Sequence, residues 1–416
     1  MKKLILSLFV LLPFLSMGQQ KENKVKIKIG GFVSAETFID SRKTVNSREG
    51  DVLLWPAAKD LDANGDDING DPEFFMTAIH SRLNVGISGF EAFGAQGSAA
   101  IQGDFVGTST ARTGLFRLRH AFIKLDWGKD EFLAGKYWHP MFVLPCNPHI
   151  LHWGGGIPVN VLGRAPQMRY TRQLGGKSYF LIAALSQLDF ASLGPDGEGN
   201  TIASSKFVQQ SAIPEITGQI CWNATKGFTM GATAGFKSVK PHLVNAKGLK
   251  SSERLGSYHM NGWVTLKSDK LAWSVQSIYG QNMSNFVMLG GYGVKNVKSN
   301  GDYEYTNIKT GSVWTDLYKP TGKVRYGLYA GYTKNMGADD DLIMEDGKYV
   351  MWSRGGNIDH VYQVAPRLEF HSGKMMVGTS LIYTAAAYGT TLASGKVDNA
   401  QEVGNTRLTL HLKYSF

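Results

Sequence analysis

The sequence predicts an all-β protein, a transmembrane antiparallel β-barrel of about sixteen strands, from three observations. Its last segment alternates apolar and polar residues without a break, and the same alternation recurs along the chain. The connections between these segments alternate between short and long, as in barrels with short periplasmic turns and long external loops. Glycine is frequent, at 49 of 416 residues, and we find no sustained helical period.

The amino terminus has the order of a secretory signal. Lys2 and Lys3 precede an apolar run from Leu4 to Leu15, and small residues follow at Ser16 and Gly18. The run is shorter than the roughly 20 residues of a spanning helix. We therefore predict a signal peptide over 1–18, cleaved before Gln19, and an exported barrel over 19–416.

The carboxyl terminus is the clearest strand in the sequence. Its apolar members are Leu408, Leu410, Leu412, Tyr414 and Phe416, and they alternate with Arg407, Thr409, His411, Lys413 and Ser415. In a barrel the apolar face would meet lipid and the polar face would line the lumen. A soluble sandwich with a solvated basic face is the alternative. The terminal aromatic residue resembles the signal that outer-membrane proteins present to the barrel assembly machinery.

Sixteen segments have strand character. They lie near 24–39, 74–90, 93–107, 114–127, 130–141, 166–174, 177–189, 213–224, 227–238, 257–268, 271–283, 311–318, 322–335, 358–371, 374–389 and 403–416. Counts of 14 or 18 stay open, because boundaries drawn from a sequence are imprecise. A barrel of this size encloses an aqueous channel.

The charge balance and the cysteines narrow the class further. The net charge is +10, which is compatible with binding to nucleic acid, binding to an acidic surface or a path for anions, and export argues against nucleic acid.

With only Cys146 and Cys221, the protein is not a scaffold built on disulfides. Whether these two form a disulfide or stay as free thiols is open.

Residues 114–142, GLFRLRHAFIKLDWGKDEFLAGKYWHPMF, carry a specific likeness. They resemble the DcaP-like trimeric porins, in which an L-R-L-R-H-A strand leads through a tight turn into an L-x-A-G-x-x-W strand. The likeness is clear over about 80–142 and points to a Bacteroidota-type member. It implies a homotrimer of sixteen-stranded barrels and a preference for small anionic solutes, including dicarboxylates.

The third long connection, 142–165, is rich in Trp, Ile, Leu and Pro for a loop in water. Gly154, Gly155 and Gly156 permit a sharp reversal of the chain. In sixteen-stranded porins the third external loop folds inward and narrows the lumen. We therefore expect 142–165 to be a constriction loop, with a plain surface loop as the alternative.

Basic residues are expected opposite this loop, on the lumen side of the strands. An arginine facing lipid near the midplane would cost about 2–4 kcal/mol, which favours an inward position for Arg117 and Arg119. The register is irregular there, since His120 and Lys124 would then point outward, at a trimer interface or near the membrane surface. The acids Asp104 and Glu369 are also expected inside. The predicted pore-lining residues are Arg82, Arg117, Arg119, Lys136, Arg164, Arg169, Arg325 and Arg367.

These basic residues have two interpretations. A ladder of arginines could bind carboxylate or phosphate oxygens transiently and select anions. Alternatively, the arginines pair with acids and only brace the barrel.

The first long loop contains a calcium-like spacing. Asp62, Asn64, Asp66, the Ile68 carbonyl and Glu73 occupy EF-hand-like positions 1, 3, 5, 7 and 12, whereas the glycine expected at position 6 is Asp67. The Asn-Gly pairs in this stretch also mark ordinary turns. Structural Ca²⁺ and a metal-free turn both stay open, and no other cofactor is expected.

Taken together, these features predict a porin for passive diffusion of small hydrophilic solutes in the outer membrane of a Gram-negative bacterium. The expected partners are small anionic solutes, outer-membrane lipid, the barrel assembly machinery and two further copies of the chain. The alternatives are a substrate-specific anion or phosphate channel and a barrel enzyme of the phospholipase or protease kind. We do not expect an enzyme, because no motif groups a nucleophile with a base and an orienting residue.

Overall fold

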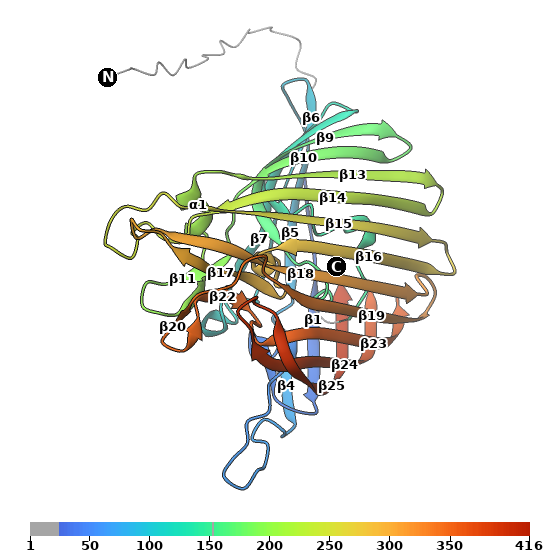
Figure 1. Cartoon of the computed structure of the whole chain (residues 1–416). Coiled ribbons are helices and arrows are strands. Elements are labelled where there is room, and N and C mark those ends of the chain that lie inside the picture. The colour runs from blue at the N-terminus through green and yellow to red at the C-terminus, as the bar shows by residue number, and fades with distance from the viewer. Residues whose placement is uncertain (1–24, 152–153) are drawn as a thin grey trace, which may run out of the picture.

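The protein is a closed antiparallel β-barrel in the computed structural model, which describes residues 25–151 and 154–416 (Figure 1). The barrel closes where the first strand, β1, pairs with the last, β25, with Phe32 opposite Ser415 and Asp40 opposite Arg407. β4 and β5 pair with successive parts of β1 and form one kinked strand. Counted in this way, the described residues form sixteen barrel strands, and the prediction is confirmed.

The barrel strands are β1 (Lys26–Asp40), β4 (Glu73–Thr77), β5 (Arg82–Ala92), β6 (Ala95–Asp104), β7 (Arg117–Asp126), β8 (Asp130–Trp138), β9 (Arg164–Gly175), β10 (Ser178–Leu185), β13 (Glu215–Thr225), β14 (Phe228–Val239), β15 (Leu255–Lys267), β16 (Ala272–Gln281), β18 (Tyr303–Tyr318), β19 (Val324–Gly337), β23 (Ile358–Ser372), β24 (Met375–Thr391) and β25 (Val397–Ser415). Each pairs antiparallel with its neighbours.

The connections carry short elements of their own. These are β2 (Thr44–Ser47), β3 (Val52–Pro56), β11 (Leu193–Pro195), β12 (Thr201–Ala203), β17 (Gly290–Val297), β20 (Met344–Glu345), β21 (Lys348–Tyr349), β22 (Met351–Arg354), the helix α1 (Lys206–Ser211) and the 3₁₀ turns η1 (Thr110–Arg112), η2 (Leu144–Cys146) and η3 (Met283–Phe286). In Figure 1 α1, β11, β17, β20 and β22 gather at one end of the barrel, opposite the tight turns. The predicted signal peptide, 1–18, lies outside the described residues. No helix among the described residues is both long and apolar enough to span a bilayer.

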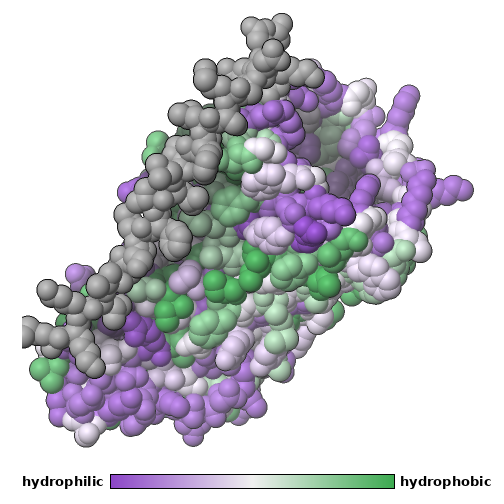
Figure 2. Space-filling view, turned by 90° about the horizontal axis from the view of Figure 1, so that it is seen from above, coloured by the Kyte–Doolittle hydropathy of each residue, from purple (hydrophilic) through white to green (hydrophobic). Residues whose placement is uncertain are grey.

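The two faces of the strands differ as their alternation predicts. On β25 the side chains of Leu408 and Leu410 are 45% and 43% exposed on the outer surface, whereas Arg407 and Thr409 point inward and are buried. A band of hydrophobic side chains crosses the molecular face in Figure 2, with hydrophilic side chains on either side of it. Such a band is what a barrel presents to lipid.

A β-bulge on β7 explains the irregular register of that strand. His120 lies opposite Gln102 and Leu118 opposite Gly103, so Arg119 is an extra residue. The extra residue reverses the alternation. Arg117 and Arg119 point inward as predicted, but so does His120, which is buried against Tyr137. Lys124 also lines an inner cavity, and the outward positions predicted for His120 and Lys124 are therefore wrong.

Candidate functional site

Loop 3, the connection 139–163 between β8 and β9, packs against the inner wall of the barrel. The Ser312 hydroxyl donates to the carbonyl of Val159 at 2.6 Å, and the Trp314 indole nitrogen donates to Asn160 at 3.1 Å. Gln363 donates to the carbonyl of Ile157 at 3.2 Å. Ser312 and Gln363 thus bind two backbone carbonyls of the loop that would otherwise need water as a partner, and Trp314 binds the Asn160 side chain. Arg164 and Ala165, the end of the predicted segment 142–165, belong to β9 instead.

The glycines of loop 3 allow this close packing. Gly155 and Gly156 have φ values of +62° and +87°, which L-residues with a side chain rarely adopt. A Cβ at Gly156 would lie 2.6 Å from the Tyr329 hydroxyl. The reversal predicted from the glycine run therefore occurs where the loop meets the wall.

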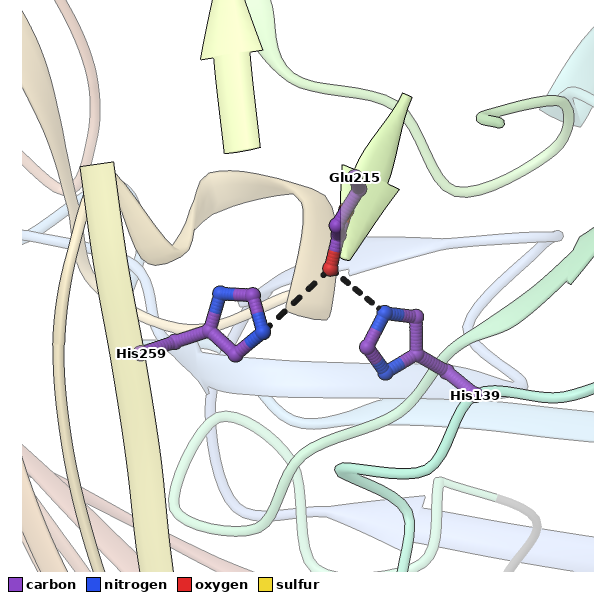
Figure 3. Close-up of side chains that lie close together, drawn as sticks. All are labelled: His139, Glu215 and His259. Carbon is purple, nitrogen blue, oxygen red and sulfur yellow. Dashed lines mark hydrogen bonds and ion pairs between the residues drawn. The ribbon is translucent and has the colours of Figure 1, made fainter. Parts of the chain in front are cut away.

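The start of loop 3 is fastened by a buried His-Glu-His cluster (Figure 3). His139 Nε2 lies 2.6 Å and His259 Nε2 3.3 Å from Glu215 Oε1. His139 Nδ1 accepts the amide hydrogen of Met141 at 3.1 Å, so its Nε2 carries the proton and donates to Glu215. The three residues come from loop 3, β13 and β15, and their contacts tie the loop to two wall strands.

Loop 1, residues 41–72, also enters the barrel, which the sequence reasoning missed. Its hairpin of β2 and β3 buries Val52, Leu54 and Trp55 in one cluster with Phe142 and Leu162 of loop 3. The sequence feature that could have indicated this inward position is the apolar run Val52–Pro56 within a long polar loop. The lumen is therefore narrowed by two loops together.

Three cavities follow one another along the lumen around these loops. The outer one, of about 290 Å³, is lined by Arg48, Arg117, Asp189 and Leu162, among others. The middle one, of about 260 Å³, shares Leu162 with it and adds Arg82, Arg119 and Arg164. The inner one, of about 640 Å³, shares Trp138 and Phe142 with the middle one and adds Lys28, Lys124 and Arg169. Each cavity has basic side chains in its lining.

Asp104, the last residue of β6, is the centre of the arginine cluster. Cross-strand pairing places it opposite Arg82 on β5 and Arg117 on β7. Its carboxylate lies 2.7 Å from Arg117 Nε, 3.3 Å from Arg119 Nε and 3.9 Å from Arg82 Nη2. One carboxylate thus faces three guanidinium groups, which leaves an excess of positive charge.

Arg164, the first residue of β9, lines the middle cavity and has no carboxylate partner among the described residues. Its side chain is 1% exposed, and none of its three nitrogens has a hydrogen-bond partner among the described residues. The guanidinium carbon lies 5.1 Å from the Trp138 ring centre and 5.0 Å from that of Phe190. A buried guanidinium held only by ring faces is ready to accept an anion.

The other predicted basic residues have different surroundings. Lys136 is paired with Asp189 at 2.5 Å, and Arg169 donates to the Trp138 carbonyl at 2.6 Å. Arg367 binds Asp316 through two nitrogens, at 2.7 and 3.1 Å, and Asp316 in turn accepts the His149 amide of loop 3. Arg325 donates to the Gly322 carbonyl at a tight turn. The structure thus brings Arg82, Arg117, Arg119, Lys136 and Arg164 together and leaves Arg325 and Arg367 on another part of the wall.

The two cysteines are buried free thiols in this structure. Cys146 of loop 3 lies 3.5 Å from the Val275 carbonyl and belongs to the same apolar cluster as Cys221. Burial raises the pKa of the Cys146 thiol to about 11. These thiols pack loop 3 and do not crosslink it.

The calcium-like segment of loop 1 forms a turn. The Asp62 carboxylate accepts the amides of Asn64 and Asp66 at 2.8 and 2.9 Å. The side chain of Asp67, where an EF-hand would have glycine, accepts the amides of Asp60 and Asn69 at 3.0 and 3.1 Å. Calcium at Asp62, Asn64, Asp66, Ile68 and Glu73 stays an untested prediction.

A closed sixteen-stranded barrel with an inward third loop has the fold of an outer-membrane porin. The chain is similar in structure to the outer membrane channel DcaP of Acinetobacter baumannii, with a TM-score of 0.68, 16% identity, and coverage of 96% of this chain and 99% of that one. It is also similar to OmpT of Vibrio cholerae in its trimer form (TM-score 0.53, 11% identity, coverage 94% and 99%).

A third similar structure is OmpF of Salmonella typhi in complex with daunomycin (TM-score 0.51, 12% identity, coverage 94% and 97%). At these identities the likeness establishes the fold. No protein-family model matches the chain, and no curated protein matches its sequence.

Proposed function

We propose that this chain is an outer-membrane porin that passes small hydrophilic solutes by passive diffusion and favours anions such as carboxylates. The observation that carries the anion preference is Arg164, a buried guanidinium in the lining of the middle cavity that has no acid partner among the described residues. Around it lie Arg82, Arg117, Arg119 and Lys136, which form ion pairs with Asp104 and Asp189, and Glu36 lines the same middle cavity. Five cations near three carboxylates produce a positive local potential, which raises the local concentration of anions.

The proposal extends to location and assembly. A signal peptide over 1–18, recognition of Phe416 by the barrel assembly machinery and insertion into outer-membrane lipid fit the apolar outer surface. A homotrimer is supported by the trimer form of the structurally similar OmpT. A particle of monomer mass in mild detergent would contradict the trimer.

The test of selectivity is the reversal potential across a planar bilayer with a salt gradient. We expect an anion preference in the wild type. Arg164→Gln should lower the anion-to-cation permeability ratio by roughly a factor of two or more, because it removes a buried charge at the narrow region.

Arg172→Gln is the matched control, because Arg172 lies on the same strand but is exposed and paired with Asp130. It should leave the ratio unchanged. Cation preference in the wild type, or equal ratios for wild type and Arg164→Gln, would contradict the proposed selectivity.

A further inference from the structure

A second cluster of polar side chains lies where the loop 1 hairpin touches the barrel wall. Asp51 occupies the turn between β2 and β3, Glu36 lies on β1, and His80 lies in the kink between β4 and β5. Their side chains are buried, and one ligand atom from each lies within 4.8 Å of those of the other two. The proposed function assigns none of them a role.

The contacts of His80 orient its ring. Nδ1 lies 2.9 and 3.0 Å from the two oxygens of Glu36, and Nε2 lies 3.4 Å from Asp51 Oδ2. A neutral imidazole carries only one N–H. At one of the two ring nitrogens a lone pair therefore faces a carboxylate, and the two repel unless a cation lies between them.

Asp51 itself is short of compensation. It is fully buried, and neither of its carboxylate oxygens accepts a hydrogen bond from the described residues. The guanidinium of Arg407 makes its hydrogen bonds to other groups and not to Asp51. It binds Asp40 at 2.7 and 2.9 Å and the Gly50 carbonyl at 2.9 Å. Among the described residues Asp51 forms its ion pair with His80 Nε2, at 3.4 Å. A buried carboxylate that accepts no hydrogen bond is expensive, and a cation bound beside it would lower that cost.

His411 on β25 adds a fourth donor. Its Nε2 lies 3.2 Å from Glu36 Oε1, and neither ring nitrogen is hydrogen-bonded in the described part of the chain. The group whose ligand atoms lie together is Glu36, Asp51 and His80, and His411 lies beside it at Glu36. Carboxylate oxygens and imidazole nitrogens are the ligands that Zn²⁺ takes in proteins.

We propose that Asp51, Glu36 and His80, with His411 beside them, bind a divalent transition-metal ion of the zinc class. The ion neutralises the two buried carboxylates and fastens loop 1 to β1 and the β4–β5 kink. The cluster of His139, Glu215 and His259 fits a metal less well, because the Met141 amide occupies the Nδ1 lone pair of His139 and leaves its Nε2 protonated. The loop 1 cluster lies beside the middle cavity, where Glu36, His80 and His411 contribute to the lining.

The test is a calorimetric titration of chelator-treated, folded full-length protein with Zn²⁺. The wild type should bind one ion per chain, and Asp51→Asn and His80→Gln should weaken binding at least about tenfold, as loss of a metal ligand does. Asp51→Asn keeps the shape and removes a buried charge, so the barrel is expected to fold. The control is His360→Gln, because His360 lies in a partly exposed cluster with Asp359 and Glu402 that could hold zinc adventitiously.

A second readout is hydrogen exchange in residues 43–57. Zn²⁺ should slow exchange there in the wild type and in His360→Gln but not in Asp51→Asn. Absence of zinc binding by the wild type would overturn the site. So would binding that survives both Asp51→Asn and His80→Gln, or binding that is lost in His360→Gln or His259→Gln.

Discussion

The guanidinium of Arg164 is stacked near the indole of Trp138, with 5.1 Å between the guanidinium carbon and the ring centre. The same ring lies 5.7 Å from the guanidinium carbon of Arg119 and stacks on Phe142 of loop 3, with 4.0 Å between ring centres. One aromatic side chain therefore contacts two arginines of the wall and a residue of loop 3. The proposed anion selectivity would thus depend on the packing of loop 3 as well as on charge.

Arg164→Lys separates charge from shape. Lysine keeps the positive charge, so the reversal potential should stay on the anion side. It lacks the planar fork that binds a carboxylate through two parallel hydrogen bonds. We expect block of the chloride current by a dicarboxylate to weaken several-fold, measured as the concentration for half block. Unchanged block would show that Arg164 acts only as a point charge.

Asp104→Asn removes the carboxylate shared by three arginines. The buried guanidinium groups of Arg117 and Arg119 would then repel each other without compensation, and we expect a loss of about 3–5 kcal/mol in the free energy of unfolding. Urea unfolding in detergent micelles, followed by tryptophan fluorescence, measures the loss. Asp130→Asn, at an exposed pair with Arg172, is the control and should lower the free energy of unfolding far less, because water and salt screen an exposed ion pair. Equal stability of the two variants would contradict the role of Asp104.

Gly156→Ala tests the packing of loop 3. The added Cβ would lie 2.6 Å from the Tyr329 hydroxyl at a φ of +87°, with a strain of roughly 1–3 kcal/mol. We expect the loop to shift from the wall, which alters the single-channel conductance and reduces anion preference.

Gly176→Ala is the matched control for this loop variant. Gly176 also has a positive φ, +57°, but no atom lies within 4 Å of its added Cβ. This variant should conduct like the wild type. A wild-type conductance and selectivity in Gly156→Ala would show that loop 3 tolerates displacement there.

The thiol of Cys146 reports whether loop 3 stays in place. Since burial raises its pKa to about 11, the thiolate fraction at pH 8 is on the order of one in a thousand, and the side chain is also shielded. In a Cys221→Ser background, labelling with a maleimide should be slow in the folded protein and fast after heating in denaturing detergent. Rapid labelling of the folded protein would mean that loop 3 leaves the wall. Faster labelling in Gly156→Ala is expected from the same reasoning.

Strand positions could be predicted here because every barrel strand alternates outward apolar residues with inward polar residues. The alternation that marks Leu408 and Leu410 as outward depends only on the two-residue period of a strand and on lipid outside. The same rule located the other strands and placed Arg117 and Arg119 inside. It failed at His120 and Lys124. The alternation is irregular there, but the extra residue that causes the irregularity, Arg119, is defined only by the pairing with β6.

The sequence by itself therefore determined the barrel, its strands and the basic character of its inner surface, since these follow from local periodicity and composition. Only the tertiary structure decided which charges are compensated. Asp104 pairs with Arg117 and Arg119, and Arg367 pairs with Asp316, whereas Arg164 contacts aromatic rings and no acid within the described part of the chain. It also decided that loop 1 enters the lumen and brings Asp51 beside Glu36 and His80. The physical reason is that charge compensation depends on distances between strands and loops far apart in the chain, which no local pattern records.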